Sequence, residues 1–261
     1  MDICLRVGIG DLLVCKAMLM KQAESEKINI TLEETHLPLR GGEPYRTFIW
    51  TFAHLLFYEP NFVIKGFERS KHTGYDDLYR NGVRPVLLPI QTQLCSKTTL
   101  EGKYVCLNTK VRGYSHDNFC RQQDILMPAL QNLSENFTLV LLGEREVEYN
   151  NEYLILTKNS VYSIYPNVKN LPKTIDLTVP VLGLTSPSIN KFKEDCAIMN
   201  GAIITLNVGY GGNLYISSSL GNTINIEETK IAFNYQMFGD RCIEYFDATS
   251  FVNALEKIKS L

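Results

Sequence analysis

Short apolar runs alternate with segments of helical periodicity along this chain, and this alternation limits its possible folds more than any other feature. Residues 2–7 and 61–67 are apolar runs bounded by turn residues, and residues 28–33 alternate like a half-buried strand. Between them, residues 11–23 and 41–58 carry apolar side chains at helical spacing. The order strand, helix, strand, helix, strand predicts a parallel sheet with covering helices.

A second strand–helix series follows residues 91–102, which lack periodicity and are interpreted as a linker. A further strand of the first series is expected over 84–90. In the second series we expect strands over 103–109, 137–144, 152–157, 202–208 and 223–228, and helices over 119–133 (bent or restarted at Pro128), 190–201 and 213–221. This organisation predicts an α/β chain with two Rossmann-like domains facing a cleft, where ligands bind beyond the carboxyl ends of the strands. We place a first domain over 1–95, a second over 96–245, and a C-terminal helix over 246–261 that could pack back on the first domain.

Composition excludes several classes of protein. The 261 residues include 45% hydrophobic and 21% charged residues, and the net charge of −2 argues against binding nucleic acid by neutralising phosphates. No apolar window is long enough for a transmembrane helix, and acids and Arg6 interrupt any signal peptide. The seven cysteines are scattered without a C-x-x-C motif, so we expect reduced core thiols in a cytoplasmic protein. The four histidines form no i, i+4 pair, so we expect no metal site.

The segment "VGIGD" places an acid at a glycine-rich turn between the first strand and the first helix. Gly8 and Gly10 would let the backbone turn sharply, and Asp11 would lie at the helix N-terminus. Asp11 is either a helix cap or a carboxylate held in the cleft as a general base. A dinucleotide-binding fingerprint is excluded, because its third glycine would fall on Leu13.

A second glycine turn lies in "NVGYGGNLYISSSLG", residues 207–221. Gly209, Gly211 and Gly212 lie between a predicted strand and a predicted helix, where free backbone N–H groups could bind a phosphate. A merely tight loop is the alternative. The serines at 217–219 would allow that helix to pack closely on the sheet.

Two further loops follow strands of the second series. Lys110 and Arg112 could contact a diphosphate, and Gly143 and Arg145 could line a base or sugar pocket. Solvated loop charges are the alternative for the basic pair.

The helix predicted over 41–58 carries an aromatic run. We interpret the run as core rather than as a sugar-stacking platform, with some members open to the cleft, and we interpret His54 as a packed histidine. The run comprises Tyr45, Phe48, Trp50, Phe52, Phe57 and Tyr58.

Three segments together resemble the bacterial ADP-heptose:lipopolysaccharide heptosyltransferases. "DICLRVGIGDLLVCKAMLMKQ" is similar to the opening of that family, where a strand ends in G-x-G-D before the first helix. "KFKEDCAIMNGAIITLNVGYGGNLYISSSLG" resembles the family's second signature, and "FTLVLLGERE" matches the segment between them. The resemblance covers about a third of the chain and implies the two-domain glycosyltransferase fold called GT-B.

The resemblance also implies roles for individual residues. Asp11 matches the family's catalytic base, Lys110 or Arg112 matches a basic residue on the donor diphosphate, and the glycine turn would bind the same diphosphate. The family's second signature has Asp-Ser/Thr-Gly and then His, whereas this chain has Tyr210-Gly211-Gly212 and Tyr215. The expected donor-binding residues are Lys110, Arg112, Gly143, Arg145, Gly209, Gly211, Gly212, Asn213 and Tyr215.

The sequence therefore predicts a glycosyltransferase that moves a sugar from a nucleotide-diphosphate sugar to a glycan or other hydroxyl acceptor. We expect no obligatory metal and no cofactor, and the resemblance implies inversion at the anomeric carbon. A non-catalytic nucleotide-sugar-binding protein and a nucleotide-sugar epimerase on the same fold are the alternatives, the first favoured by the substitution of Tyr215 for the expected His.

Overall fold

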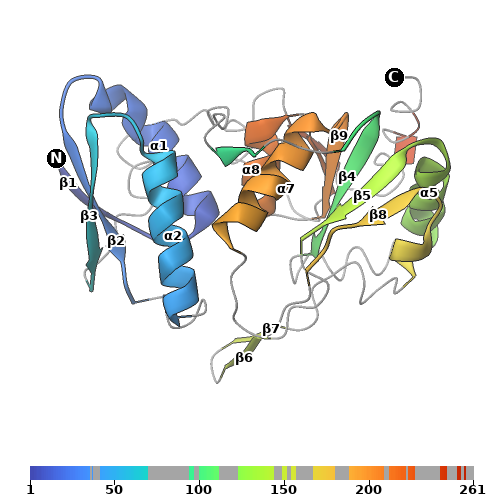
Figure 1. Ribbon diagram of the computed structural model, residues 1–261, viewed down its shortest axis with the longest axis horizontal. Helices are drawn as coiled ribbons and strands as arrows, with labels where there is room; N and C mark the ends of the chain where they lie inside the picture. Colours follow the sequence, from blue (N-terminus) through green and yellow to red (C-terminus); the bar gives the residue numbers. More distant parts are fainter. Residues whose placement is uncertain are drawn as a thin grey trace.

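Two parallel sheets organise the chain in the computed structural model (Figure 1). The structure describes residues 1–35, 37, 42–69, 94–96, 100–111, 123–143, 149–151, 154–156, 167–179, 188–208, 212–221, 223–226, 242–245, 252–253 and 256. At some of these positions, including Lys110 and Asn213, it describes the backbone but not the side chain.

The first sheet has three parallel strands in the order β1-β2-β3. Its strands are β1 (Asp2–Leu5), β2 (Ile28–Glu33) and β3 (Phe62–Glu68), connected through α1 (Ile9–Ala23) and α2 (Gly42–Leu56). Both helices lie on the side of this sheet that faces the second sheet (Figure 1). The three strands and two helices match the predicted elements within a few residues.

The second sheet has six parallel strands in the order β11-β10-β9-β4-β5-β8. The strands are β4 (Tyr104–Val111), β5 (Thr138–Leu142), β8 (Thr174–Asp176), β9 (Ile204–Val208), β10 (Thr223–Ile226) and β11 (Cys242–Tyr245). The remaining described elements are α5 (Gln123–Asn136), α7 (Ile189–Gly201), α8 (Gly212–Leu220), the 3-10 helix η3 (Val168–Asn170) and an antiparallel hairpin of β6 (Tyr149–Asn151) and β7 (Leu154–Leu156). Parallel pairing throughout both large sheets confirms the α/β class.

Successive side chains along β4 point to opposite faces of the second sheet and belong to two different clusters of buried residues. Val105 and Leu107 of β4 belong to a cluster that includes Leu130 and Leu133 of α5. Cys106, between them in sequence, belongs instead to the cluster that includes residues of α7 and α8. The period of two along β4 therefore places α5 on one face of the sheet and α7 and α8 on the other.

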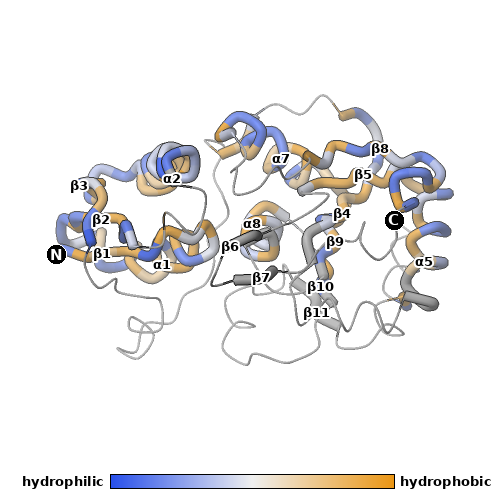
Figure 2. Tube along the Cα trace, turned by 90° about the horizontal axis from the view of Figure 1, so that it is seen from below, coloured by the Kyte–Doolittle hydropathy of each residue, from blue (hydrophilic) through white to orange (hydrophobic). Residues whose placement is uncertain are grey.

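A single core joins the two sheets. One cluster of buried side chains includes residues of α1 and α2 together with residues of α7 and α8. At its centre the Phe192 ring meets the rings of Phe48 and Phe52 edge-on, at centroid distances of 5.6 and 5.5 Å. Figures 1 and 2 show the resulting layers from two directions: the first sheet, α1 with α2, α7 with α8, the second sheet, and α5.

A buried lysine fixes α1 against the end of α2. Lys16 Nζ donates to the carbonyl oxygen of Leu56 at 2.6 Å and pairs with Glu59 Oε1 at 2.8 Å. A cation at the last carbonyl groups of a helix also interacts favourably with the negative end of the helix dipole. This contact helps to set the position of α1, which carries the candidate catalytic turn.

Some predicted elements differ from the structure or lie outside its described part. Helix α5 runs through Pro128 as one element rather than restarting there. The strands β6, β8 and β11 were not predicted, and the strand predicted over 84–90 lies outside the described residues. Val252, in the predicted C-terminal helix, packs against the cluster that includes α5 residues. The domain boundaries and the cleft between domains remain predictions.

Five cysteines whose side chains the structure describes are free. Cys4, Cys15, Cys106 and Cys196 are buried, and Cys95 is half-buried. Burial raises the pKa of the Cys15, Cys106 and Cys196 thiols, so these groups stay protonated. Among the described helices none is long and apolar enough to cross a membrane.

Candidate functional site

The N-terminal turn places Asp11 inside the first turn of α1 rather than at its cap. The helix begins at Ile9, and the N-cap position is Gly8, which has no side chain to cap with. The interpretation of Asp11 as the helix cap is therefore wrong. As the third helical residue, its carboxylate still lies where the helix dipole stabilises a negative charge. Its charge acts with burial to raise the pKa of the Cys15 thiol, one turn further along α1.

The glycine at position 10 serves a close approach between the two halves of the chain. A Cβ built on Gly10 would lie 2.9 Å from Cδ2 of Tyr215, a residue of α8. Gly8 is extended, at φ −96° and ψ 137°, and Gly10 is helical, so neither needs the conformational freedom that the sequence suggested. Only glycine at position 10 leaves room for the Tyr215 ring, and the first turns of α1 and α8 meet at this contact.

We expect Gly10→Ala to lower the free energy of unfolding by about 1 kcal/mol, because overpacking against the Tyr215 ring outweighs the gain in helix propensity. In a Tyr215→Ala background the same change should raise the stability instead, since the obstructing ring is gone. The measurement is a double-mutant cycle by urea denaturation.

Gly221→Ala is the matched control, because a Cβ at Gly221 would meet no atom within 4 Å. Its effect on stability should have the same sign with and without the Tyr215 ring. If Gly10→Ala behaves as Gly221→Ala does in both backgrounds, the close approach at Gly10 is not present in solution.

The other predicted residues that the structure describes lie at or after the carboxyl ends of parallel strands in the second sheet. Lys110 is the next-to-last residue of β4, and Gly143 follows β5 with φ +97°, a conformation that favours glycine. Gly212 and Asn213 open α8, so their backbone amides lie at the helix N-terminus. Parallel pairing brings these strand ends to one edge of the sheet. Arg112, Arg145, Gly209 and Gly211 lie outside the described residues.

A buried amide network beneath this edge was not predicted. Asn108 of β4 donates through Nδ2 to Oδ1 of Asn207 of β9, and Asn207 donates through Nδ2 to the hydroxyl of Ser217 of α8 at 3.0 Å. The pairing of β4 with β9 shifts register immediately after Leu107, so the amides connect the strands where the regular ladder breaks. The network fixes α8 to both strands just before the predicted glycine turn.

Arg6 is a second candidate that sequence reasoning missed. It follows the last residue of β1 and precedes Gly8, and its Nε is buried without a hydrogen-bond partner. A cation at the carboxyl end of a parallel strand suits an anionic ligand at the adjacent turn. Its position two residues before the G-x-G-D segment was the available signal.

No protein-family model matches the sequence, and no curated protein matches it. Among solved structures, the chain is similar to the iron-containing dodecameric glycosyltransferase TibC of enterotoxigenic E. coli H10407, with a TM-score of 0.50 and 9% identity. The match covers 94% of this chain and 62% of that one. The likeness is one of fold. A second TibC structure, described as a heptosyltransferase in complex with ADP-D-beta-D-heptose, gives a TM-score of 0.48 and 10% identity over 89% of this chain and 58% of that one.

The chain thus spans about 62% of the length of TibC. TibC contains iron, and in the described part of this chain no three His, Cys, Asp or Glu side chains come together as metal ligands.

Proposed function

We propose that this protein is a GT-B glycosyltransferase that transfers a sugar from a nucleotide-diphosphate sugar to an acceptor hydroxyl. The contact between Gly10 and Tyr215 carries this proposal. It joins the turn that holds Asp11 to the helix that follows the second glycine turn, although the two are about 200 residues apart in sequence. The glycosyltransferase fold of TibC is consistent with the same assignment.

The two sides of this contact suit different roles: the start of α8 suits the binding of a diphosphate, and the first turn of α1 holds the proposed base, Asp11. The first turns of α1 and α8 both present the positive ends of helix dipoles. The donor diphosphate would bind at the α8 amides and Lys110, with Arg112, Arg145 and the glycines of the turn around it. The positive end of α8 and the basic side chain of Lys110 would stabilise the charge that grows on the leaving group without a metal ion.

In the proposed step the acceptor oxygen attacks the anomeric carbon while the bond from that carbon to the diphosphate oxygen breaks. The nucleoside diphosphate leaves with the electron pair, and Asp11 takes the proton of the acceptor hydroxyl. Attack from the face opposite the leaving group gives inversion. The free thiols of the described core support a cytoplasmic location for this chemistry.

A non-catalytic nucleotide-sugar-binding protein is the second candidate, and one observation favours it. Tyr215, which stands where the heptosyltransferase pattern has His, lies with its ring against Gly10. A binding protein would hold the nucleotide at the same sheet edge but leave the donor intact.

The first experiment is a thermal-shift screen of UDP, GDP, ADP and CMP and their sugar conjugates, with EDTA or with magnesium or manganese. A ligand at 100 times its dissociation constant adds about 2.7 kcal/mol, which corresponds to a rise in Tm of roughly 5 °C for a chain of this size. We expect one nucleoside diphosphate to give this shift in EDTA. The responding sugar conjugate is then incubated with the protein, and release of the nucleoside diphosphate is measured.

Lys110→Ala should reduce the shift, whereas Lys169→Ala, an exposed lysine in η3, should not. Nucleotide binding without donor turnover would favour the binding protein. The absence of any nucleotide response would contradict both candidates.

A further inference from the structure

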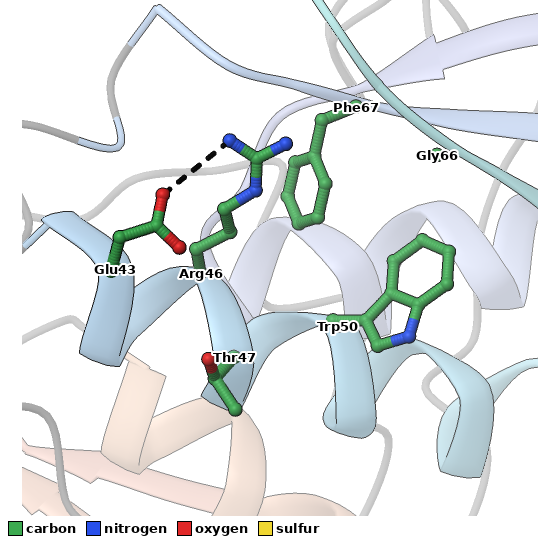
Figure 3. Close-up of a pocket in the computed structure, with 6 residues that line it drawn as sticks. All are labelled: Glu43, Arg46, Thr47, Trp50, Gly66 and Phe67. Atoms are coloured by element: carbon green, nitrogen blue, oxygen red, sulfur yellow. Dashed lines mark ion pairs between the residues drawn. The ribbon is translucent and has the colours of Figure 1, made fainter.

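We propose that a pocket between α2 and β3 is a second binding site, which takes an uncharged sugar ring. The pocket has a volume of about 350 Å³, within the range of small-molecule sites, about 300–1,000 Å³. Its lining residues are Glu43, Arg46, Thr47, Trp50, Gly66 and Phe67 (Figure 3). The predicted glycosyltransferase site uses none of these residues.

The pocket lies on the face of α2 that is turned away from α7. Phe48 and Phe52 meet Phe192 of α7, whereas Trp50 is about 200° around the helix from Phe48. Arg46 and Trp50, one turn apart, form the pocket side of α2 (Figure 3). Trp50 is half-buried, so its indole is neither a core group nor a freely exposed one.

A β-bulge in β3 builds the opposite wall. The pairing with β2 aligns Ile64 with Ile30 but Phe67 with Leu32, so one extra residue turns Phe67 to the same face as Ile64, towards α2. Gly66, at the bulge, has φ +146°, and a Cβ there would have no atom within 4 Å. The bulge therefore turns the Phe67 ring towards α2, and Gly66 at the bulge lines the same pocket.

The two aromatic groups contact each other and together form one apolar wall of the pocket. The Trp50 and Phe67 centroids are 5.7 Å apart, and their planes differ by 34°. The Arg46 guanidinium lies 4.5 Å from the Phe67 centroid, so the ring stands between a cation and an indole (Figure 3). Because Arg46 and Trp50 both lie against the Phe67 ring, we take the half-buried indole of Trp50, which lines the pocket, as the apolar surface for the C–H groups of a pyranose ring.

The charges around the pocket are balanced. Arg46 pairs with Glu34 at 2.7 Å and with Glu43 at 3.7 Å, and Arg69 pairs with the other oxygen of Glu34 at 3.7 Å. Two cations opposite two carboxylates give no net attraction for a phosphate or an ammonium group. The carboxylate of Glu43 and the hydroxyl of Thr47 offer hydrogen bonds at the rim. An apolar floor with a polar, neutral rim fits a polyhydroxyl ligand, either a free sugar or one residue of a glycan chain.

Trp50 is the only tryptophan in the chain, so its emission reports on this pocket. The 261-residue protein is titrated with methyl glycosides of glucose, galactose, mannose and N-acetylglucosamine, and with their oligosaccharides, up to about 50 mM. We expect a saturable change in Trp50 fluorescence with a dissociation constant of about 1 mM or tighter for at least one sugar. Tighter binding of the oligosaccharide than of its methyl glycoside identifies a glycan chain as the ligand, and equal binding identifies a free sugar.

Thr47→Phe fills the pocket from an exposed helical position, where the added ring displaces no core side chain, and should abolish the response. Thr51→Phe adds the same ring one turn along α2, outside the lining residues, and should retain it. No response to any saccharide, an unchanged response in Thr47→Phe, or the same response to a nucleotide or a charged aromatic compound each overturns the proposal. The proposal is independent of nucleotide binding, so its failure would leave the proposed function standing.

Discussion

Asp11→Asn is expected to lower the rate of sugar transfer by at least about a hundredfold, because a positioned general base contributes roughly 10²–10⁴ to such a step. The amide has the size of the carboxylate but cannot accept the proton of the acceptor hydroxyl. The diphosphate would be held by α8 and Lys110, so donor affinity should change less than about twofold. The measurements are turnover of the donor found in the thermal-shift screen, and the concentration dependence of its Tm shift for both proteins.

Asp2→Asn is the matched control. Asp2 is an exposed acid at the other end of β1, where it accepts a hydrogen bond from Asn29 at 2.8 Å, and its neutralisation should leave turnover unchanged. Equal losses of turnover and donor affinity in Asp11→Asn would show that Asp11 holds the nucleotide rather than the proton. Unchanged turnover would return Asp11 to a purely structural role in the first turn of α1.

The elements of the fold were largely predictable because periodicity is a local property. The strand over 28–33 and the helix over 190–201 are found almost residue for residue, since burial on one face repeats every two or 3.6 residues. The short strands β8 and β11 carry too few residues to show a period. The shared core could not be predicted, because the meeting of Phe48, Phe52 and Phe192 depends on rings about 140 residues apart.

In the candidate site, too, local features could be predicted from the sequence and long-range contacts could not. The sequence identified Gly10 and Tyr215 separately but attributed the glycine to backbone freedom, because nothing local reveals the ring that needs its space. Asn108 and Asn207 are 99 residues apart, and only the sheet order makes them neighbours. Trp50 is different. The sequence already showed that Trp50 lies on the opposite side of the helix from Phe48 and Phe52. His54, one turn further on, lies on the same side as Trp50, and its ring centroid is 4.3 Å from that of the indole. The interpretation of His54 as a packed core histidine is wrong, because its side chain is exposed.

The second large effect concerns the packing that joins the two sheets. Phe192→Ala should lower the free energy of unfolding by about 3–5 kcal/mol, since it removes a buried ring from between Phe48 and Phe52. The lost ring is also a main connection between α2 and α7. Urea unfolding followed by circular dichroism and by Trp50 fluorescence, which reports on the first sheet, should therefore change from coincident to separate transitions.

Phe62→Ala separates this coupling from a general loss of stability. Phe62 is as buried as Phe192, at 6% exposure, but its ring packs on Phe57, between β3 and the end of α2, at a centroid distance of 5.2 Å. Phe62→Ala should lower the free energy of unfolding by a similar amount. Circular dichroism and Trp50 fluorescence should still report one transition, because the contact between α2 and α7 is intact. If Phe192→Ala also leaves the probes coincident, the two sheets are coupled by the remaining packing of α1 on α8, which includes the approach of the Tyr215 ring to Gly10. Separate transitions in the unmodified protein would instead mean that the two sheets, each with its own helices, unfold independently in solution.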